Sequence, residues 1–287
     1  MSYRYLQKKW YDLTREKHNQ QEQWFLRFAF TDNPLNWRNL KFFEINPPKH
    51  YIYADPFIAT NKGKNFILFE IDNHEEPKGY LGACEIFTDG THSEVKTILT
   101  LDYHLSYPFV FEYETQWYMI PETSANRTVE LWEAIDFPYH WQKKMTLIEN
   151  IETVDNTLYY HNGMWYLLTS TKLGSKKFGN RLDVFISDNI FSQNWQPHPQ
   201  NPVKNNLLFE RPAGNLFVHD GKLYRPVQDS IKRYGGSMQL RQINNLSTQD
   251  YQEVAIDNIN PQHFDCIGTH TFSYANGVLV MDALRKV

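Results

Sequence analysis

The sequence has few cysteines and no long apolar run, and each absence excludes a class of protein. Its 287 residues include two cysteines, Cys84 and Cys266, which lie far apart and form no CxxC motif. They therefore predict neither a disulfide framework nor a zinc site, and we expect both to be small buried apolar residues. No apolar run approaches the ~20 residues that a membrane span needs.

Signals for export and for nucleic-acid binding are also missing. The first 23 residues are polar and lack the apolar segment of a secretory signal. Acidic and basic residues are mixed along the chain, with a net charge of -4, which argues against a nucleic-acid surface. We therefore expect a cytoplasmic protein with no nucleic-acid partner and no membrane span.

Common cofactor and catalytic motifs are absent as well. The chain has no GxGxxG after a strand, no GxxxxGK[ST], no GxSxG and no HExxH. Its histidines, cysteines and carboxylates show no clustered spacing that would demand a metal ion. The sequence thus predicts neither a cofactor nor a metal.

What the sequence does contain is a unit of strand, turn and strand that recurs five times. The copies span residues 55–70, 107–122, 155–170, 211–228 and 268–282. Four of the turns carry Asn or Asp followed by Gly, in one case with Lys62 between them, and such turns favour tight hairpins because these residues tolerate positive φ. The second strands are rich in aromatic and branched residues, which suits a sheet buried on both faces.

The spacing of the copies predicts the fold. Equivalent positions lie 48 to 57 residues apart, which leaves room for four strands in each unit. Third strands are expected at 80–88, 128–136, 181–187 and 237–243, and fourth strands near 93–99, 143–149 and 252–256. Such units predict an all-β protein, a five-bladed β-propeller, with an irregular β-sandwich as the alternative.

The fifth unit has only two strands before the sequence ends at Val287. Residues 23–30 alternate as a strand, and we expect this N-terminal strand to close the last blade. The predicted organisation is therefore an arm or short helix over residues 1–22 and a single propeller domain over residues 23–287.

In a propeller the first strands line the central channel, so the residues that open the five units should meet there. These are Asp55, Tyr107, Asp155, Glu210 with Arg211, and His270. Three carboxylates from three blades suit glycosidic bond cleavage, which needs a base or nucleophile, a proton donor and often a third, positioning group. The alternative is structural: the aspartates cap turns, and Glu210 pairs with Arg211.

A second polar layer follows the second strands and either reaches the channel mouth or links blades. It comprises Glu70, Glu122, Arg225, Gln228, Asp229 and Asp282. From both layers we select candidates for binding a glycan or an activated sugar: Tyr107, Glu122, Arg211, Arg225, Asp229 and His270.

The blade openings resemble the five-bladed propellers of the glycoside hydrolase family 43 type, which includes relatives of arabinanases, levansucrases and invertases. The matching segments are Ala54-Asp55-Pro56, Val154-Asp155-Asn156 and Glu210-Arg211-Pro212. The resemblance implies Asp55 as catalytic base, Asp155 as orienting carboxylate and Glu210 as acid, with His270 where this type often places a histidine. Arg211 replaces a small residue, and beside Glu210 it is expected to lower the pKa of that carboxyl and weaken it as an acid.

A more specific resemblance lies in "YADPF", "HLSYPFVFE", "WYMIPE", "NPV" and "RPAGNLFVHDGKLYRPVQD". Over roughly residues 24 to 284 the chain is similar to the N-terminal propeller region of plant glucosamine inositolphosphorylceramide transferases and their bacterial relatives. Three functions follow as hypotheses. The first is a glycoside hydrolase-like enzyme. The second is a glycosyltransferase of bacterial surface-glycan synthesis (capsule or lipopolysaccharide), in which Arg211 and Arg225 meet a sugar phosphate, and the third is a non-catalytic glycan-binding propeller.

Overall fold

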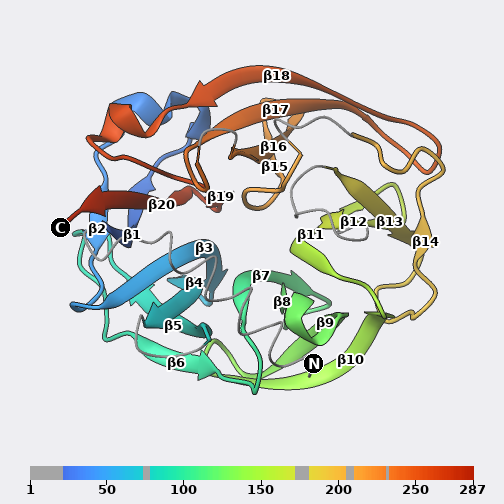
Figure 1. Cartoon of the computed structure of the whole chain (residues 1–287), viewed down its shortest axis with the longest axis horizontal. Helices are drawn as coiled ribbons and strands as arrows, with labels where there is room; N and C mark the ends of the chain where they lie inside the picture. Colours follow the sequence, from blue (N-terminus) through green and yellow to red (C-terminus); the bar gives the residue numbers. More distant parts are fainter. Residues whose placement is uncertain (1–21, 74–77, 172–180, 205–209, 231–232) are drawn as a thin grey trace, which may run out of the picture.

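A computed structural model describes residues 22–287 except 74–77, 172–180, 205–209 and 231–232. The described chain forms five four-stranded antiparallel sheets arranged around a central axis (Figure 1). Within these described residues, three short 3₁₀ helices accompany the sheets: η1 (Pro34–Asn39), η2 (Ser124–Asn126) and η3 (Pro261–Phe264). The predicted five-bladed β-propeller is confirmed. Among the described residues, no helix has the length and apolar character needed to cross a membrane.

Each blade is built from strands that are consecutive in the chain, except the last. The first contains β3 (Tyr51–Asn61), β4 (Lys64–Asn73), β5 (Tyr80–Ile86) and β6 (Lys96–Leu99). The second contains β7 (Ser106–Tyr113), β8 (Gln116–Glu122), β9 (Thr128–Asp136) and β10 (His140–Glu149). The third contains β11 (Thr153–His161), β12 (Met164–Thr171), β13 (Asp183–Ser187) and β14 (Gln196–Pro197). The fourth contains β15 (Phe217–His219), β16 (Lys222–Asp229), β17 (Ser237–Leu246) and β18 (Tyr251–Ile259).

The two ends of the described chain close the ring together. The fifth blade has the order β19 (Phe272–Ala275), β20 (Val278–Lys286), β1 (Glu22–Phe30) and β2 (Phe43–Ile45). The antiparallel pairing of β1 with β20 runs from Glu22 opposite Lys286 to Phe30 opposite Val278. The predicted closure of the last blade by the N-terminal strand is thus confirmed. The predicted arm or helix falls almost entirely on residues 1–21, which lie outside the described part.

The predicted third strands are present in the four blades where they were expected, and the predicted fourth strands in three. Sequence reasoning missed two outer strands, β2 and β14, because three and two residues are too few to show an alternating pattern. The hairpin turns have the expected left-handed residues, such as Asn162 and Gly163 with φ of 49° and 79°. The second blade makes the same turn without glycine, through Glu114 and Thr115.

The hydrophobic core lies between neighbouring blades. In one cluster the Phe57 ring of the first blade contacts the Tyr107 and Phe109 rings of the second, at centroid distances of 4.7 and 5.6 Å. Cys84 and Cys266 are free and buried, as predicted. Because side chains from both faces of the sheets hold the blades together, the inner strands are rigid supports for residues at the axis.

Candidate functional site

Three first strands share one irregularity at equivalent positions. Asp55, Tyr107 and Asp155 have φ of 51°, 45° and 56°, a conformation that costs a non-glycine residue about 1–3 kcal/mol. At each of them the strand pairing skips residues, between Ala54 and Phe57, Ser106 and Phe109, and Val154 and Thr157. Such a bulge re-aims a side chain, and its repetition explains why these residues occupy matching places around the axis.

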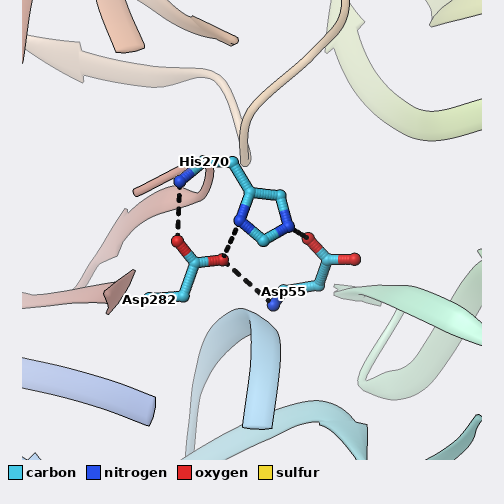
Figure 2. Close-up of side chains that lie close together, drawn as sticks. All are labelled: Asp55, His270 and Asp282. Carbon is cyan, nitrogen blue, oxygen red and sulfur yellow. Dashed lines mark hydrogen bonds and ion pairs between the residues drawn. The ribbon is translucent and has the colours of Figure 1, made fainter. Parts of the chain in front are cut away.

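The first group at the axis is a buried histidine between two carboxylates (Figure 2). His270 Nε2 lies 3.2 Å from Asp55 Oδ1, and its Nδ1 lies 2.9 Å from Asp282 Oδ2. The Asp282 carboxylate also accepts the backbone N–H groups of His270 and Thr271, at 2.7 and 3.0 Å. The Thr271 hydroxyl donates to Asp55 Oδ1 at 2.8 Å.

These contacts set the charges of the triad. Burial alone would lower the pKa of His270, but Asp282 and Asp55 outweigh it and raise this pKa to about 10. Burial likewise opposes ionisation of Asp55, yet the His270 imidazolium and the Thr271 hydrogen bond hold the pKa of Asp55 below its usual value. At neutral pH the triad therefore contains an imidazolium and an ionised Asp55.

The ligand atoms of Asp55, His270 and Asp282 lie within 4.8 Å of one another, close enough for a small cation. However, both ring nitrogens of His270 face carboxylate oxygens. In this arrangement, a metal ion would have to displace the proton that a ring nitrogen shares with a carboxylate. The arrangement fits a buried ion-pair triad better than a metal site.

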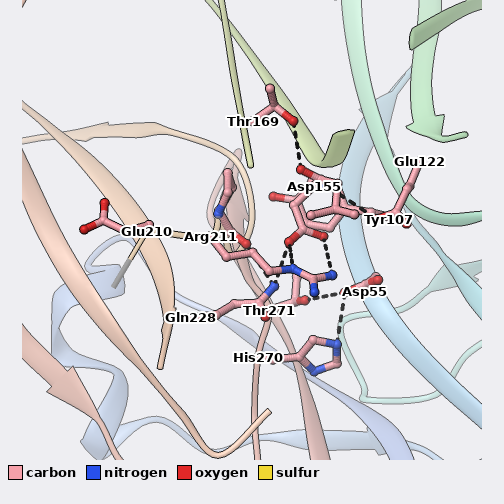
Figure 3. Close-up of polar contacts among 12 residues, drawn as sticks. Asp55, Tyr107, Glu122, Asp155, Thr169, Glu210, Arg211, Gln228, His270 and Thr271 are labelled. Atoms are coloured by element: carbon pink, nitrogen blue, oxygen red, sulfur yellow. Dashed lines mark hydrogen bonds and ion pairs between the residues drawn. The ribbon is translucent and has the colours of Figure 1, made fainter. Parts of the chain in front are cut away.

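The second group pairs Asp155 with Arg211 across two blades (Figure 3). Arg211 Nε contacts Asp155 Oδ2, and Nη2 lies 3.1 Å from Oδ1, so the pair is bidentate. Gln228 Nε2 also donates to Asp155 Oδ2 at 3.0 Å. The sequence suggested that Arg211 acts on its neighbour Glu210, whereas the folded chain directs the guanidinium to Asp155. The buried carboxylate of Glu210 points away from this pair in Figure 3.

Two glutamates from the second strands complete the set, and both are 9% exposed. Glu122 Oε2 accepts the backbone N–H of Asp155 at 3.4 Å. Burial, reinforced by Asp155 and Asp55, raises the pKa of Glu122 to about 8. Burial and Asp55 also raise the pKa of Glu70 well above its usual value. Glu122 is therefore largely protonated at neutral pH, while Asp55 is ionised, and such opposite shifts are characteristic of acid and base pairs.

We refer to Asp55, Glu122, Asp155, Arg211 and His270 as the central site. All five were singled out from the sequence, and the structure brings them together through direct contacts and shared electrostatic interactions. The catalytic roles proposed for them are considered below.

Besides Glu210, three selected residues lie outside the central site. Tyr107 is fully buried, and its hydroxyl oxygen accepts the Gly214 N–H at 2.7 Å, so it braces the axis. Arg225 is also fully buried, and its Nε and Nη2 each lie 2.8 Å from Glu253 on the outer strand β18. Asp229 ends β16 and accepts a hydrogen bond from Ser237 at 3.0 Å. The structure therefore directs Arg225 outward between blades, away from the channel.

Two aromatic residues form one wall of the central site, and neither was selected from the sequence. The Trp24 ring lies 4.4 Å from the His270 ring, and the Tyr234 ring lies 5.3 Å from it. The Arg211 guanidinium lies 5.4 Å from the centre of the Tyr234 ring. Tyr234 is 44% exposed and thus forms part of the surface around the site. Trp24 showed only as part of an alternating strand, and Tyr234 stands in a loop with no pattern to reveal it.

Comparison with known proteins identifies sequence relatives. A family model described as "Glucosamine inositolphosphorylceramide transferase 1, N-terminal" matches residues 41–265. Glucosamine inositolphosphorylceramide transferase 1 of Oryza sativa subsp. japonica is 33% identical over 215 residues, which cover 73% of this chain and 28% of the relative. The protein of that name from Arabidopsis thaliana is 32% identical over 214 residues, with the same coverage. The chain thus spans little more than a quarter of the relatives' length.

Solved structures with the same fold include sugar hydrolases. A family 117 glycoside hydrolase of Zobellia galactanivorans has a TM-score of 0.57 at 12% identity, covering 84% of this chain and 77% of its own. An α-L-arabinofuranosidase of Lactobacillus brevis has a TM-score of 0.56 at 14% identity, with coverages of 74% and 81%. The Cellvibrio cellulosa α-L-arabinanase, solved with arabinohexaose, has a TM-score of 0.51 at 12% identity, with coverages of 79% and 82%. At these identities the likeness concerns the fold alone.

Proposed function

This chain belongs to the family defined by the N-terminal region of glucosamine inositolphosphorylceramide transferase 1, and we propose that it is a carbohydrate-active enzyme acting on a glycosidic bond. The observation that carries the proposal is the central site, where carboxyl groups with opposite pKa shifts meet at the axis. The names of the relatives and the hydrolase activity of proteins with this fold support a sugar as the substrate.

Asp55 takes the role of base in this proposal. Its ionised carboxylate is held by the Thr271 hydroxyl and the His270 imidazolium, which fix its orientation. It removes the proton from a water molecule or an acceptor hydroxyl as the oxygen of that group attacks the anomeric carbon. Asp155, fixed by Arg211 and Gln228, orients the sugar.

We assign the role of proton donor to Glu122 in place of Glu210. Glu122 holds a proton at neutral pH because of its burial and its acidic neighbours, and its carboxyl group adjoins the backbone of Asp155. It delivers this proton to the glycosidic oxygen as the bond to the anomeric carbon breaks. The carboxylate of Glu210, which the family resemblance favoured, points away from Asp155 and Arg211 (Figure 3).

The pH dependence of turnover tests the assignment of Glu122. A general acid must be protonated, so kcat/KM is expected to hold around neutral pH, where Asp55 is ionised, and to fall as the pH rises through about 8. Asp55, Asp155 and Arg211 are the charged groups that act on Glu122. In the Glu122→Gln variant, kcat/KM should be about 10²–10⁴-fold lower and should no longer fall as the pH rises through about 8. If kcat/KM of the variant still falls in the same pH range, Glu122 is not the proton donor.

The proposed function is tested by NMR-monitored turnover across a panel of furanosides, pyranosides and nucleotide sugars. Release of a free sugar identifies a hydrolase. Absence of any product, while glycans still bind, would overturn the enzyme proposal in favour of a glycan-binding propeller.

The family name favours a second candidate, a glycosyltransferase of surface-glycan synthesis. In this case Asp55 removes the proton from the acceptor hydroxyl as its oxygen attacks the anomeric carbon of a nucleotide sugar. The bond from that carbon to the phosphate oxygen breaks, and the nucleoside phosphate leaves. The same NMR panel separates the two candidates, because a transferase consumes a nucleotide sugar only when an acceptor is present.

A further inference from the structure

A cavity of about 420 Å³ lies beside the central site, at one end of the fourth blade. Its volume is in the range of small-molecule binding sites, about 300–1,000 Å³. Polar side chains of the lining come from Asp229, Arg233, Ser237, Asn258, Asn260 and Gln262. Apolar side chains of the lining come from Ile259, Pro261, Cys266 and Ile267.

The cavity opens at the end of the propeller that carries the central site. Asp229 is the last residue of β16, and Ser237 is the first of β17. The residue before Asp229 is Gln228, which donates to Asp155. Because successive side chains of a strand point to opposite faces, β16 presents Gln228 to the central site and Asp229 to the cavity.

Residues 233–236 border both the central site and the cavity. Tyr234 packs against His270, while Arg233 and Gly236 line the cavity. Gly235 has φ of 63°, and a Cβ atom there would lie 2.5 Å from the Trp24 ring. This residue must therefore be glycine for the segment to pass so close to the wall of the central site.

We propose that the cavity is a second binding subsite, which holds the sugar or polyol unit linked to the sugar in the central site. This inference rests on the proposed function. The Asn258 and Gln262 amides and the Ser237 hydroxyl offer both donors and acceptors, and the partly exposed Ile267 adds an apolar contact.

The charges of the lining favour an uncharged unit over a phosphate. Arg233, which would be the natural ligand of a phosphate, lies 2.8 Å from Glu22 Oε2 in an ion pair. Asp229 accepts the Ser237 hydroxyl, and its negative charge opposes the entry of an anion.

NMR titration with matched monosaccharides and disaccharides tests the subsite. The probes are methyl β-D-glucopyranoside with cellobiose, methyl α-L-arabinofuranoside with α-1,5-arabinobiose, and glucosamine with its β-1,4 dimer. The wild-type protein is expected to bind the disaccharide of its preferred pair about tenfold more tightly, the effect of one or two hydrogen bonds. Asn258→Leu with Gln262→Leu should abolish this preference and leave monosaccharide binding unchanged, whereas the exposed control Gln252→Leu on the same strand should retain it.

Equal affinity of the wild-type protein for both members of a pair would overturn the subsite and leave the proposed function standing. A disaccharide preference that survives in the double variant would also overturn it. If no probe binds, the subsite fails, and the turnover panel decides the proposed function separately.

Discussion

Replacing Asp55 by asparagine is expected to lower turnover by about 10²–10⁴-fold, the usual contribution of a general base. Asparagine preserves the shape of the side chain and its carbonyl can still accept the Thr271 hydroxyl, but it cannot take a proton from the attacking oxygen. The loss should appear in kcat, measured by NMR on the substrate that the panel identifies.

The fold of this variant should survive, and thermal unfolding together with the NMR fingerprint checks that it does. Asp188→Asn is the matched control, because Asp188 is exposed in the turn after β13 and should leave turnover unchanged. If Asp55→Asn retains wild-type kcat, Asp55 is not the base.

Replacing Glu253 by leucine is expected to lower the free energy of unfolding by about 3–5 kcal/mol, the cost of leaving a buried charge without its partner. Both side chains of the Arg225–Glu253 pair are 0% exposed, and Glu253 also pairs with Arg241 at 3.0 Å. The Tyr251 hydroxyl donates to the same carboxylate at 2.6 Å. Urea unfolding followed by tryptophan fluorescence measures the change.

Two further variants separate the buried charge from simple loss of packing. Arg225→Met combined with Glu253→Leu should recover most of the lost stability, because apolar residues of similar volume can replace a buried ion pair. Glu133→Leu removes a partly exposed pair with Lys144 and should cost no more than about 1 kcal/mol. A loss below about 1 kcal/mol in Glu253→Leu would contradict the structural role of Arg225.

Arg225 also shows where sequence reasoning ended. It was selected as a substrate ligand because it follows an apolar stretch in the repeat, as Glu122 does. On strand β16, however, Arg225 contacts Glu253, while Gln228 contacts Asp155 of the neighbouring blade. The repeat predicted the strand, but the packing of the blades decides which residues each of its side chains contacts.

The features that could be predicted from the sequence are those with local causes. Hairpin turns need left-handed residues at two positions, and strands need alternating or continuous apolar residues. The five repeats and the closing strand can therefore be recognised from the sequence. Equivalent repeat positions also share a place around the axis, and the structure places Asp55 and Asp155 at matching bulges of their strands.

The contacts and charges of the central site follow only from the tertiary structure. Arg211 pairs with Asp155 of another blade, and Glu122 has a raised pKa because of residues from other blades. Trp24 and Tyr234, also from different blades, both pack against His270. A pKa depends on burial and on charges within a few ångströms, and neither is set by neighbours in sequence. Glu122 therefore becomes a candidate acid only when the blades close and surround it with Asp55 and Asp155.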